Sequence, residues 1–207
     1  MTKSQREKRF RHITTLVTPR LTLRKIALSD VSDVYEYARE ESVTRYLLWS
    51  PHDSEGYTFE YLQNVQAAYR RGDFYDWGIE ITETKKMIGT CGFTSFDHDH
   101  NRAEVGYVLN PAFWGNGYAT EALRAVIAYG FRELEIERIE AHYMAENAPS
   151  RRVMEKCAMT YEGTLKRYML VKGAYRDIGI CAVLKEDYPF YDAYQERRPL
   201  RLFPSLW

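Results

Sequence analysis

The chain has 207 residues, enough for one domain with a full hydrophobic core. Lysine and arginine together number 29, as do aspartate and glutamate, so the formal net charge is zero. This balance gives no overall electrostatic attraction to nucleic acid or anionic membrane, so an acidic ligand must be recognised by a local patch or by backbone amides.

The start of the chain is polar and basic and lacks the apolar core of a signal peptide. No apolar run approaches the ~18–20 residues of a membrane span. Three cysteines, Cys91, Cys157 and Cys181, lie far apart in apolar stretches, which favours small buried side chains over metal ligands or nucleophiles. We therefore expect a soluble, cytoplasmic protein that begins with a loose arm over residues 1–16.

The first elements are a strand and two helices. Residues 21–26 alternate between apolar and polar side chains, which predicts a strand. Ser29 is expected to cap a helix that ends near Arg39. A second helix is expected to begin after Ser54 and to end at Gly72, because apolar side chains recur between them at helical spacing.

A meander of three strands follows, and then the hydrophobic period changes. From Tyr118 onward, small and apolar residues recur at steps of three and four, which predicts a long helix. The remaining pattern predicts a strand, a short helix and a hairpin that turns at Lys172 and Gly173. In chain order these later elements are expected near 77–81, 87–96, 103–109, 118–134, 138–144, 149–156, 161–171 and 175–184.

This order of elements predicts an α/β fold around a mixed sheet. Neighbouring meander strands must be antiparallel, whereas the strand–helix–strand unit centred on residue 125 requires a parallel pair. The result is a mostly antiparallel sheet and not a doubly wound one. We expect one domain over residues 17–187, followed by a tail over 188–207 whose Phe203, Leu206 and Trp207 suit docking on a surface or on a second subunit of a homodimer.

The most informative stretch runs from a strand through a short loop into the long helix. Gly115 and Gly117 stand where that helix begins. The first turn of a helix presents backbone N–H groups without internal partners, and its dipole adds partial positive charge. Glycines let phosphate groups approach the backbone closely. The pattern therefore predicts a pyrophosphate cradle that needs no net basic charge.

Other interpretations of the two glycines remain open at this point. A Rossmann fingerprint would end in glycine or alanine where Thr120 stands, although Glu140 lies at a suitable distance for a ribose-binding acid. An antiparallel meander would not feed a Rossmann unit. The Gly-Lys-Ser/Thr of a P-loop is absent, and a plain glycine turn is the remaining alternative.

Several ordered motifs resemble the GNAT acetyltransferase superfamily, and within it the Rim-type ribosomal-protein-alanine N-acetyltransferases. The run Trp114-Gly115-Asn116-Gly117-Tyr118-Ala119 is similar to the family's phosphate loop, with tryptophan where glutamine or arginine is usual. The resemblance covers about residues 17–187. It also includes Thr18–Arg24, Ala103–Tyr107, Asn147–Lys156 and the hairpin segment Gly173–Asp177.

The resemblance implies a GNAT-like fold with about seven strands, splayed where acetyl-CoA binds, and direct attack of an amine on the thioester without an acyl-enzyme. It implies that the Val108 N–H polarises the acetyl carbonyl and that the Leu109 backbone binds pantetheine. The pyrophosphate would be held by Gly115, Asn116, Gly117 and Ala119, with Thr120. Trp114, Tyr118 and Ser150 are further cofactor-binding candidates.

Glu104 is the candidate general base, and it shares one face of its strand with Gly106 and Val108. An exposed glutamate is a weak base at neutral pH, so the assignment requires partial burial. The alternative is a solvated carboxylate or a salt bridge to Arg102 or Arg138.

Asn147 is expected to bond the pantetheine arm or the catalytic group near it, with a helix-entry turn as its alternative role. A tyrosine that protonates the leaving thiolate in many family members is replaced here by Met154, so Ser150 is the candidate acid, with helix capping as its alternative. His98, Asp99 and His100 share one tight turn without a distant partner, so we expect no metal site.

The acceptor is expected to be an α-amine, because an α-amine loses its proton near neutral pH far more easily than lysine does. This agrees with the protein N-termini that Rim-type enzymes acetylate. A small-molecule amine, a non-catalytic acyl-CoA sensing module and a dinucleotide enzyme are the alternatives. Tyr46, Trp49 and Tyr175 are acceptor-cleft candidates by position only.

Overall fold

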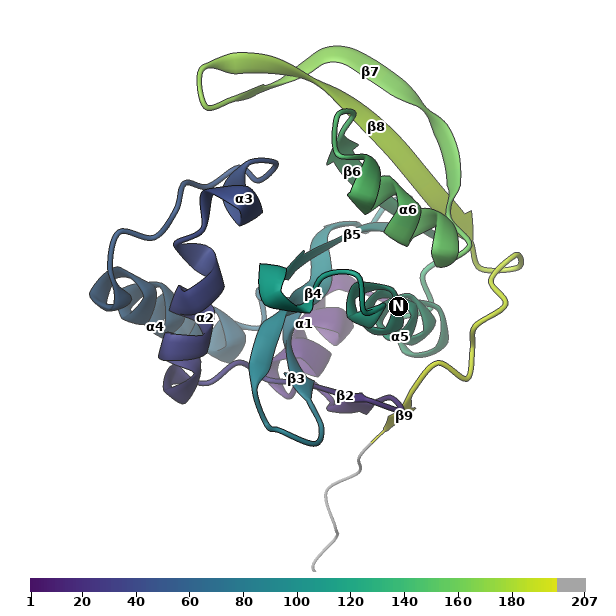
Figure 1. Cartoon of the computed structure of the whole chain (residues 1–207). Helices are drawn as coiled ribbons and strands as arrows, with labels where there is room; N and C mark the ends of the chain where they lie inside the picture. The colour runs from purple at the N-terminus through teal and green to yellow at the C-terminus, as the bar shows by residue number, and fades with distance from the viewer. Residues whose placement is uncertain (197–207) are drawn as a thin grey trace, which may run out of the picture.

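The computed structural model describes residues 1–196, and its centre is one sheet (Figure 1). Over the described residues the sheet has nine strands in the order β7-β8-β6-β5-β4-β3-β2-β1-β9. The strands are β1 (Leu16–Val17), β2 (Leu21–Arg24), β3 (Asp76–Ile81), β4 (Met87–Asp97), β5 (Arg102–Leu109), β6 (Arg138–Met144), β7 (Thr160–Val171), β8 (Ala174–Leu184) and β9 (Gln195–Glu196).

The expected mixed sheet is confirmed. Strands β5 and β6 pair in parallel, and every other neighbouring pair is antiparallel. The seven strands β2 to β8 correspond to the seven expected ones, and the two-residue strands β1 and β9 extend one edge. The helices are α1 (Lys3–Arg11), α2 (Val31–Ala38), α3 (Glu41–Thr44), α4 (Glu55–Arg71), α5 (Tyr118–Glu133) and α6 (Ala148–Lys156), with 3-10 turns at Leu28–Asp30 and Pro111–Phe113.

Helix α5 covers one face of the sheet, and helices α2 and α4 cover the other (Figure 1). The helical stripe read from the sequence is the buried side of α5, which packs with Trp77, Phe93 and Ile139 in the larger core cluster. A smaller cluster joins α2 and α4 to the sheet, for example through Tyr37 and Tyr69. Each fully buried large side chain contributes about 1.5–3 kcal/mol to stability. These two layers fix β4 and β5, on which the candidate site is built.

The expectation of a loose N-terminal arm is wrong. Residues 3–11 form helix α1, and the Thr2 side chain and Gln5 cap its start in a reciprocal capping box. Phe10 is fully buried, and its ring lies edge-on to the rings of Tyr75 and Trp77. Arg6 is also buried and donates to Nδ1 of His98 at 2.9 Å. The helix has no apolar stripe that would have predicted its packing. Its two buried side chains, Phe10 and Arg6, anchor it to the domain.

Helix α4 has the predicted ends. The Ser54 side chain accepts from the N–H of Tyr57, and Gly72 ends the helix with a φ of 84°. The expected cap of the preceding helix is wrong, because Ser29 lies inside a 3-10 turn and Asp30 occupies the N-cap position of α2. The Asp30 carboxylate accepts from the N–H of Ala27 at 2.7 Å, so it stabilises this 3-10 turn.

The described part of the tail packs against the domain. Tyr188 is buried against Phe131, and the Tyr188 hydroxyl donates to the carbonyl of Arg124 at 2.7 Å. Strand β9 pairs with β1 at the edge of the sheet. The tail residues singled out in the sequence, Phe203, Leu206 and Trp207, lie outside the described residues. Within residues 1–196, no helix is long and apolar enough to cross a membrane.

Candidate active site

Strands β5 and β6 separate where the candidate site begins. They pair at three positions only, Arg102 with Arg138, Ala103 with Ile139 and Glu104 with Glu140. Beyond Glu104, β5 continues beside β4 to Leu109, whereas β6 continues beside β8 to Met144. The backbone edges of β5 and β6 therefore face each other unpaired. A gap of this kind can receive an extended ligand that bonds to strand backbone on either side.

The loop after β5 delivers a bare helix N-terminus to one end of this gap. Gly115 and Gly117 have φ values of 78° and 80°, a region that residues with a Cβ adopt at a cost of about 1–2 kcal/mol. No side chain caps α5, and Gly117 itself occupies the N-cap position. A Cβ added to Gly115 would have nothing within 4 Å. The N–H groups of the first turn thus remain available to an anionic group.

Arg20 fixes this loop to the helix that follows it. Its guanidinium bonds the Glu121 carboxylate through Nε at 2.7 Å and the carbonyl of Asn116 through Nη1 at 3.0 Å. The same guanidinium lies over the Tyr118 ring, 4.5 Å from its centroid. The other oxygen of Glu121 accepts from Thr18. Sequence reasoning gave Arg20 no role, although it lies in the Thr-Pro-Arg-Leu segment that carried the resemblance.

A pocket of about 600 Å³ opens beside the first two turns of α5. Three cationic side chains and two carboxylates belong to its lining, and the chain segment before β9 closes one side. Arg124 is held there by the carbonyl of Lys156 and by the Phe190 ring, 3.8 Å from its guanidinium. The lining residues are Pro19, Arg20, Gly117, Thr120, Glu121, Arg124, Lys156, Pro189, Phe190, Asp192 and Ala193.

The other expected cofactor-binding residues lie around the same loop. The Trp114 indole donates to the carbonyl of Leu109 at 2.8 Å, and the Asn116 amide donates to the carbonyl of Trp114 at 3.1 Å. Both bonds brace the turn that joins β5 to α5. Val108 lies on β5 opposite Thr90 of β4. Tyr118, Ala119 and Thr120 form the first turn of α5.

Glu104 lies at the point where β5 and β6 part. Its side chain is 27% exposed, and Oε2 is 3.6 Å from Nδ1 of His142 on β6. Nε2 of the same imidazole is 3.8 Å from the carboxylate of Glu140. The suggested salt bridges do not form, because Arg102 pairs with Asp97 and Glu140, and Arg138 pairs with Glu140 and Glu162. Glu104 is therefore partly buried and has no arginine partner within the described chain.

His142 was missed in the sequence. It lies two residues beyond Glu140, so the two side chains share one face of β6. The parallel pairing of Glu104 with Glu140 then brings the imidazole to Glu104. This register depends on the sheet and leaves no local signal in the sequence.

Ser150 and Asn147 meet at the start of α6. The Asn147 side chain accepts from the N–H of Ser150 at 3.2 Å and occupies the N-cap position, so the helix-entry alternative is observed for Asn147. Ser150 is not the cap. Its Oγ lies 2.8 Å from the Tyr107 hydroxyl, which also lies 2.9 Å from the Ser150 carbonyl. Burial raises the pKa of Tyr107, which keeps this phenol neutral.

The three acceptor-cleft candidates lie on three separate parts of the fold. Tyr46 packs against Met144, whereas Trp49 lies in the loop after α3. Tyr175 is 58% exposed on β8. The β7–β8 hairpin arches toward α3 (Figure 1), and Lys172 at its turn donates to the carbonyl of Thr44 at 2.7 Å. The hairpin thus spans the space between the two sides of the fold.

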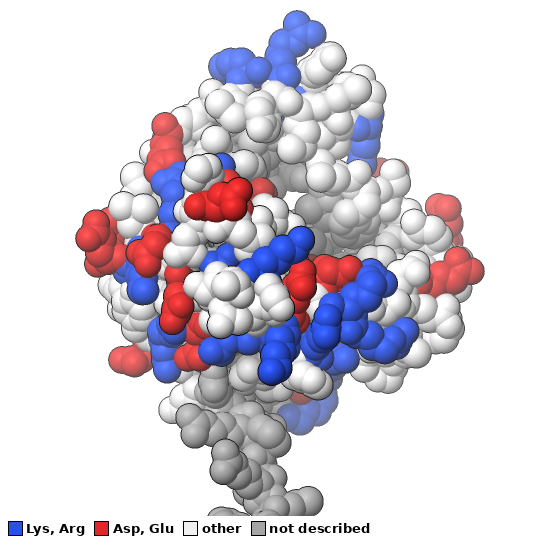
Figure 2. Space-filling model, turned by 180° about the vertical axis from the view of Figure 1, so that it is seen from behind, with Lys and Arg blue, Asp and Glu red and all other residues white. Residues whose placement is uncertain are grey.

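Charges of both signs are mixed over the face seen from behind (Figure 2), so no single-sign patch marks a nucleic-acid surface there.

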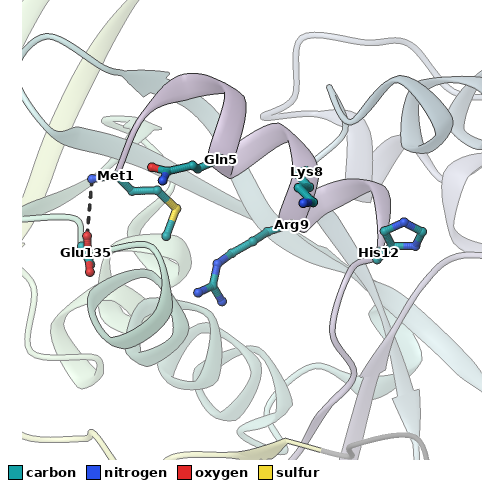
Figure 3. Close-up of a pocket in the computed structure, with 6 residues that line it drawn as sticks. All are labelled: Met1, Gln5, Lys8, Arg9, His12 and Glu135. Carbon is teal, nitrogen blue, oxygen red and sulfur yellow. Dashed lines mark ion pairs between the residues drawn. The ribbon is translucent and has the colours of Figure 1, made fainter.

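A second pocket, of about 460 Å³, lies where α1 meets the C-terminal end of α5 (Figure 3). Its lining includes the Met1 amine, 3.4 Å from Glu135. It lies at the end of α5 remote from the glycine loop, so we assign it no part in the site.

The cysteines take no part in the site. All three are buried, as expected, and burial raises the pKa of the Cys157 thiol to about 12. Among the described residues, no group of three histidine, cysteine or acidic side chains could hold a metal ion.

Comparison with known proteins identifies relatives of this chain among the acetyltransferases. The family model described as an acetyltransferase (GNAT) domain matches residues 20–160. The uncharacterized N-acetyltransferase p20 of Bacillus licheniformis is 36% identical, over 84% of this chain and 98% of the relative. The [ribosomal protein uS5]-alanine N-acetyltransferase of Escherichia coli is 28% identical, over 84% of this chain and 92% of the relative.

Solved structures agree with the sequence relatives. The crystal structure of a GNAT-family acetyltransferase from Bacillus anthracis superimposes with a TM-score of 0.75 at 29% identity. The match covers 83% of this chain and 99% of that one.

Proposed function

The chain belongs to the GNAT acetyltransferase family, and we propose that it transfers the acetyl group of acetyl-CoA to the α-amine of a peptide or protein N-terminus. The observation that carries the proposal is the position of Glu104, a partly buried carboxylate at the point where β5 and β6 separate. One end of the gap carries the glycine loop for a phosphate group. On this proposal, base and cofactor cradle serve one cleft that follows the gap between β5 and β6.

The residues present fit acetyl-CoA, whose thioester supplies the acetyl group. Gly115 and Gly117 leave the loop open, and the uncapped first turn of α5 offers N–H groups to the pyrophosphate. We propose that the backbone of Val108 and Leu109 holds the pantetheine arm and the acetyl carbonyl. The remaining loop contacts would come from Trp114, Asn116, Tyr118, Ala119, Thr120 and, at the start of α6, Asn147.

Glu104 would accept a proton from the acceptor amine, directly or through a water molecule. His142 flanks the carboxylate from the β6 side, with Nδ1 3.6 Å from Oε2. Deprotonation at pH 7 costs ~1 kcal/mol for an α-amine and ~4.6 kcal/mol for a lysine side chain. A single carboxylate base is therefore better matched to an α-amine, which favours a peptide N-terminus over a lysine.

Ser150 would return a proton to the departing thiolate. When the Tyr107 hydroxyl donates to the Ser150 carbonyl, the Ser150 hydroxyl can donate to Tyr107 or to a thiolate. Only modest help is needed, because a thiol of pKa about 8.5 is a fair leaving group. Ser150→Ala should accordingly lower kcat by less than Glu104→Gln does.

The test is release of free CoA from acetyl-CoA by the wild type and by Glu104→Gln. The panel contains N-terminal peptides, peptides whose only amine is a lysine side chain, and small primary amines. We expect turnover with the N-terminal peptides and a loss of about 10²-fold or more in the variant. Saturable acetyl-CoA binding without release for any amine would contradict catalysis and support a sensing module. Turnover with small amines alone would move the acceptor to the small-molecule class.

A further inference from the structure

Two glycines lie side by side on neighbouring strands, on the sheet face opposite α5. Asp76 of β3 pairs with Gly92 of β4, and Gly92 pairs with Gly106 of β5. Glu104 lies two residues from Gly106 and therefore on the same face. Gly92 and Gly106 contribute no side chains to the floor between the Asp76 and Glu104 carboxyl groups, and the Thr94 methyl group lies over Gly106, 2.9 Å from where its Cβ would be.

The Asp76 carboxyl group lies over this floor. A Cβ placed on Gly92 would come within 2.3 Å of Asp76 Oδ1. Asp76 makes no side-chain hydrogen bond or ion pair within the described chain, although part of its surface remains accessible. Desolvation raises the pKa of this carboxyl group to about 7. A carboxylate enclosed by protein without a partner is costly, and a bound cation would offset that cost.

Two phenols lie close enough to the Asp76 carboxyl group to interact with it electrostatically. Asp76 acts electrostatically on Tyr61 of α4 and on Tyr37 of α2, and burial raises the pKa of Tyr61 to about 12. Neither hydroxyl makes a hydrogen bond to a described residue. One carboxyl group and two phenol oxygens with unused acceptor capacity thus gather beneath helices α2 and α4.

We propose that Asp76, Tyr37 and Tyr61 form a subsite that binds a second cationic group of the acceptor, while Glu104 serves the amine that is acetylated. The proposal rests on the proposed function of Glu104. From strand spacing and rise, the backbones of Asp76 and Glu104 lie about 12 Å apart. The acceptor would therefore carry a positive charge several bonds away from its reacting amine.

A cation fits this set of groups better than other ligands do. Carboxylate and phenol oxygens accept N–H bonds, and the bonds to an ionised carboxylate are the strong ones. An anion would be repelled, and a neutral hydroxyl group would leave the carboxylate without a counter-charge. Figure 2 shows the molecule hollowed below its upper part, where the hairpin arches, which leaves room for an acceptor to enter from that side.

The first test compares diaminoalkanes of four to eight carbons with monoamines of the same length as acceptors. The wild type should prefer the diamine in kcat/KM. In Asp76→Asn this preference should fall at least about tenfold, the effect of losing one charge-assisted hydrogen bond. The control is Asp73→Asn, three residues earlier, where an exposed carboxylate pairs with Arg71. Equal use of both amines by the wild type, or an unaltered preference in Asp76→Asn, would overturn the subsite.

A parallel arm identifies the source of the cation. Peptides beginning Ala-Lys are compared with peptides beginning Ala-norleucine, which have the same length without the second charge. A lysine preference lost in Asp76→Asn indicates a basic protein N-terminus, whereas a preference confined to diamines indicates a small polyamine. Tyr61→Phe provides a second variant, expected to weaken the preference in the same direction.

Binding separates failure of the subsite from failure of the proposed function. Calorimetric titration of the CoA-loaded protein with a diamine and with its monoamine does not depend on turnover. Tighter diamine binding that is lost in Asp76→Asn but kept in Glu104→Gln supports the subsite even if no acetyl transfer occurs. Equal affinity for the two amines rejects the subsite, even if acetyl transfer is efficient.

Discussion

Nδ1 of His142 lies 3.6 Å from Oε2 of Glu104, on the neighbouring strand. Glu140 flanks the other ring nitrogen at 3.8 Å. The imidazole therefore lies between two carboxylates, that of Glu104 on β5 and that of Glu140 on its own strand. We therefore expect the ring to restrict the rotamers that the Glu104 side chain can adopt.

His142→Gln tests that positioning role. Loss of the imidazole frees the Glu104 side chain, so we expect kcat to fall about tenfold while the KM for acetyl-CoA changes little. Steady-state kinetics with the preferred acceptor measures this split. His100→Gln, at an exposed turn position, is the matched control. An equal rise in the KM for acetyl-CoA would instead place His142 in cofactor binding.

Arg20→Ala should weaken acetyl-CoA binding. The guanidinium joins Glu121 to the carbonyl of Asn116, so its loss releases the glycine loop from α5 and removes a positive charge beside it. We expect the KM for acetyl-CoA to rise about tenfold, with a smaller change in kcat. Arg39→Ala is the control, because its exposed ion pair to Glu40 lies elsewhere. Equal KM values for the two variants would remove Arg20 from the cradle.

Gly117→Ala should cost both stability and cofactor affinity. A Cβ at a φ of 80° is strained by about 1–2 kcal/mol, and it also crowds the approach to the first helical turn. Gly56→Ala in α4 is the matched control, since its Cβ would meet only Ser54 Oγ at 3.7 Å. That change should stabilise the protein by about 0.5–1 kcal/mol. Urea unfolding and acetyl-CoA titration measure the two effects, and a fully stable Gly117→Ala would contradict the strain.

Asp76→Asn should stabilise the protein at neutral pH. The pKa of Asp76 rises from 3.8 to about 7 on folding, so the folded state keeps a proton that the unfolded state has lost between those values. Wild-type stability therefore falls as pH rises through this interval and stays lowered above it. Asparagine does not titrate, so the advantage of the variant should grow from pH 4 to pH 7, by at most about 4 kcal/mol.

Urea unfolding at several pH values measures this difference. Asp73→Asn should show no such growth, because its carboxylate is exposed and paired with Arg71. A difference between Asp76→Asn and wild type that is flat with pH would mean that the Asp76 carboxyl group is well solvated. That result would remove Asp76 as the anionic group of the cation subsite.

The sequence by itself determined the elements whose signals are local. Ser54 and Gly72 mark the ends of α4 because a side-chain oxygen and a left-handed residue satisfy the terminal backbone groups of the helix within a few residues. The apolar stripe beginning at Tyr118 predicted α5 because its spacing matches the helical period. The order of strands and helices then required a mixed sheet, and the two glycines predicted the uncapped N-terminus of α5.

Tertiary structure alone decided which distant groups meet. Helix α1 is polar along its length, so only the burial of Phe10 and the bonds of Arg6 reveal why it is held. Arg20 and Glu121 are 101 residues apart, and the meeting of Glu104 with His142 depends on the register of β5 against β6. Nothing in the sequence distinguishes Asp76 from other aspartates at strand ends, and only the folded chain desolvates its carboxyl group and raises its pKa. Burial, register and desolvation are properties of the packed chain, so local spacing cannot encode them residue by residue.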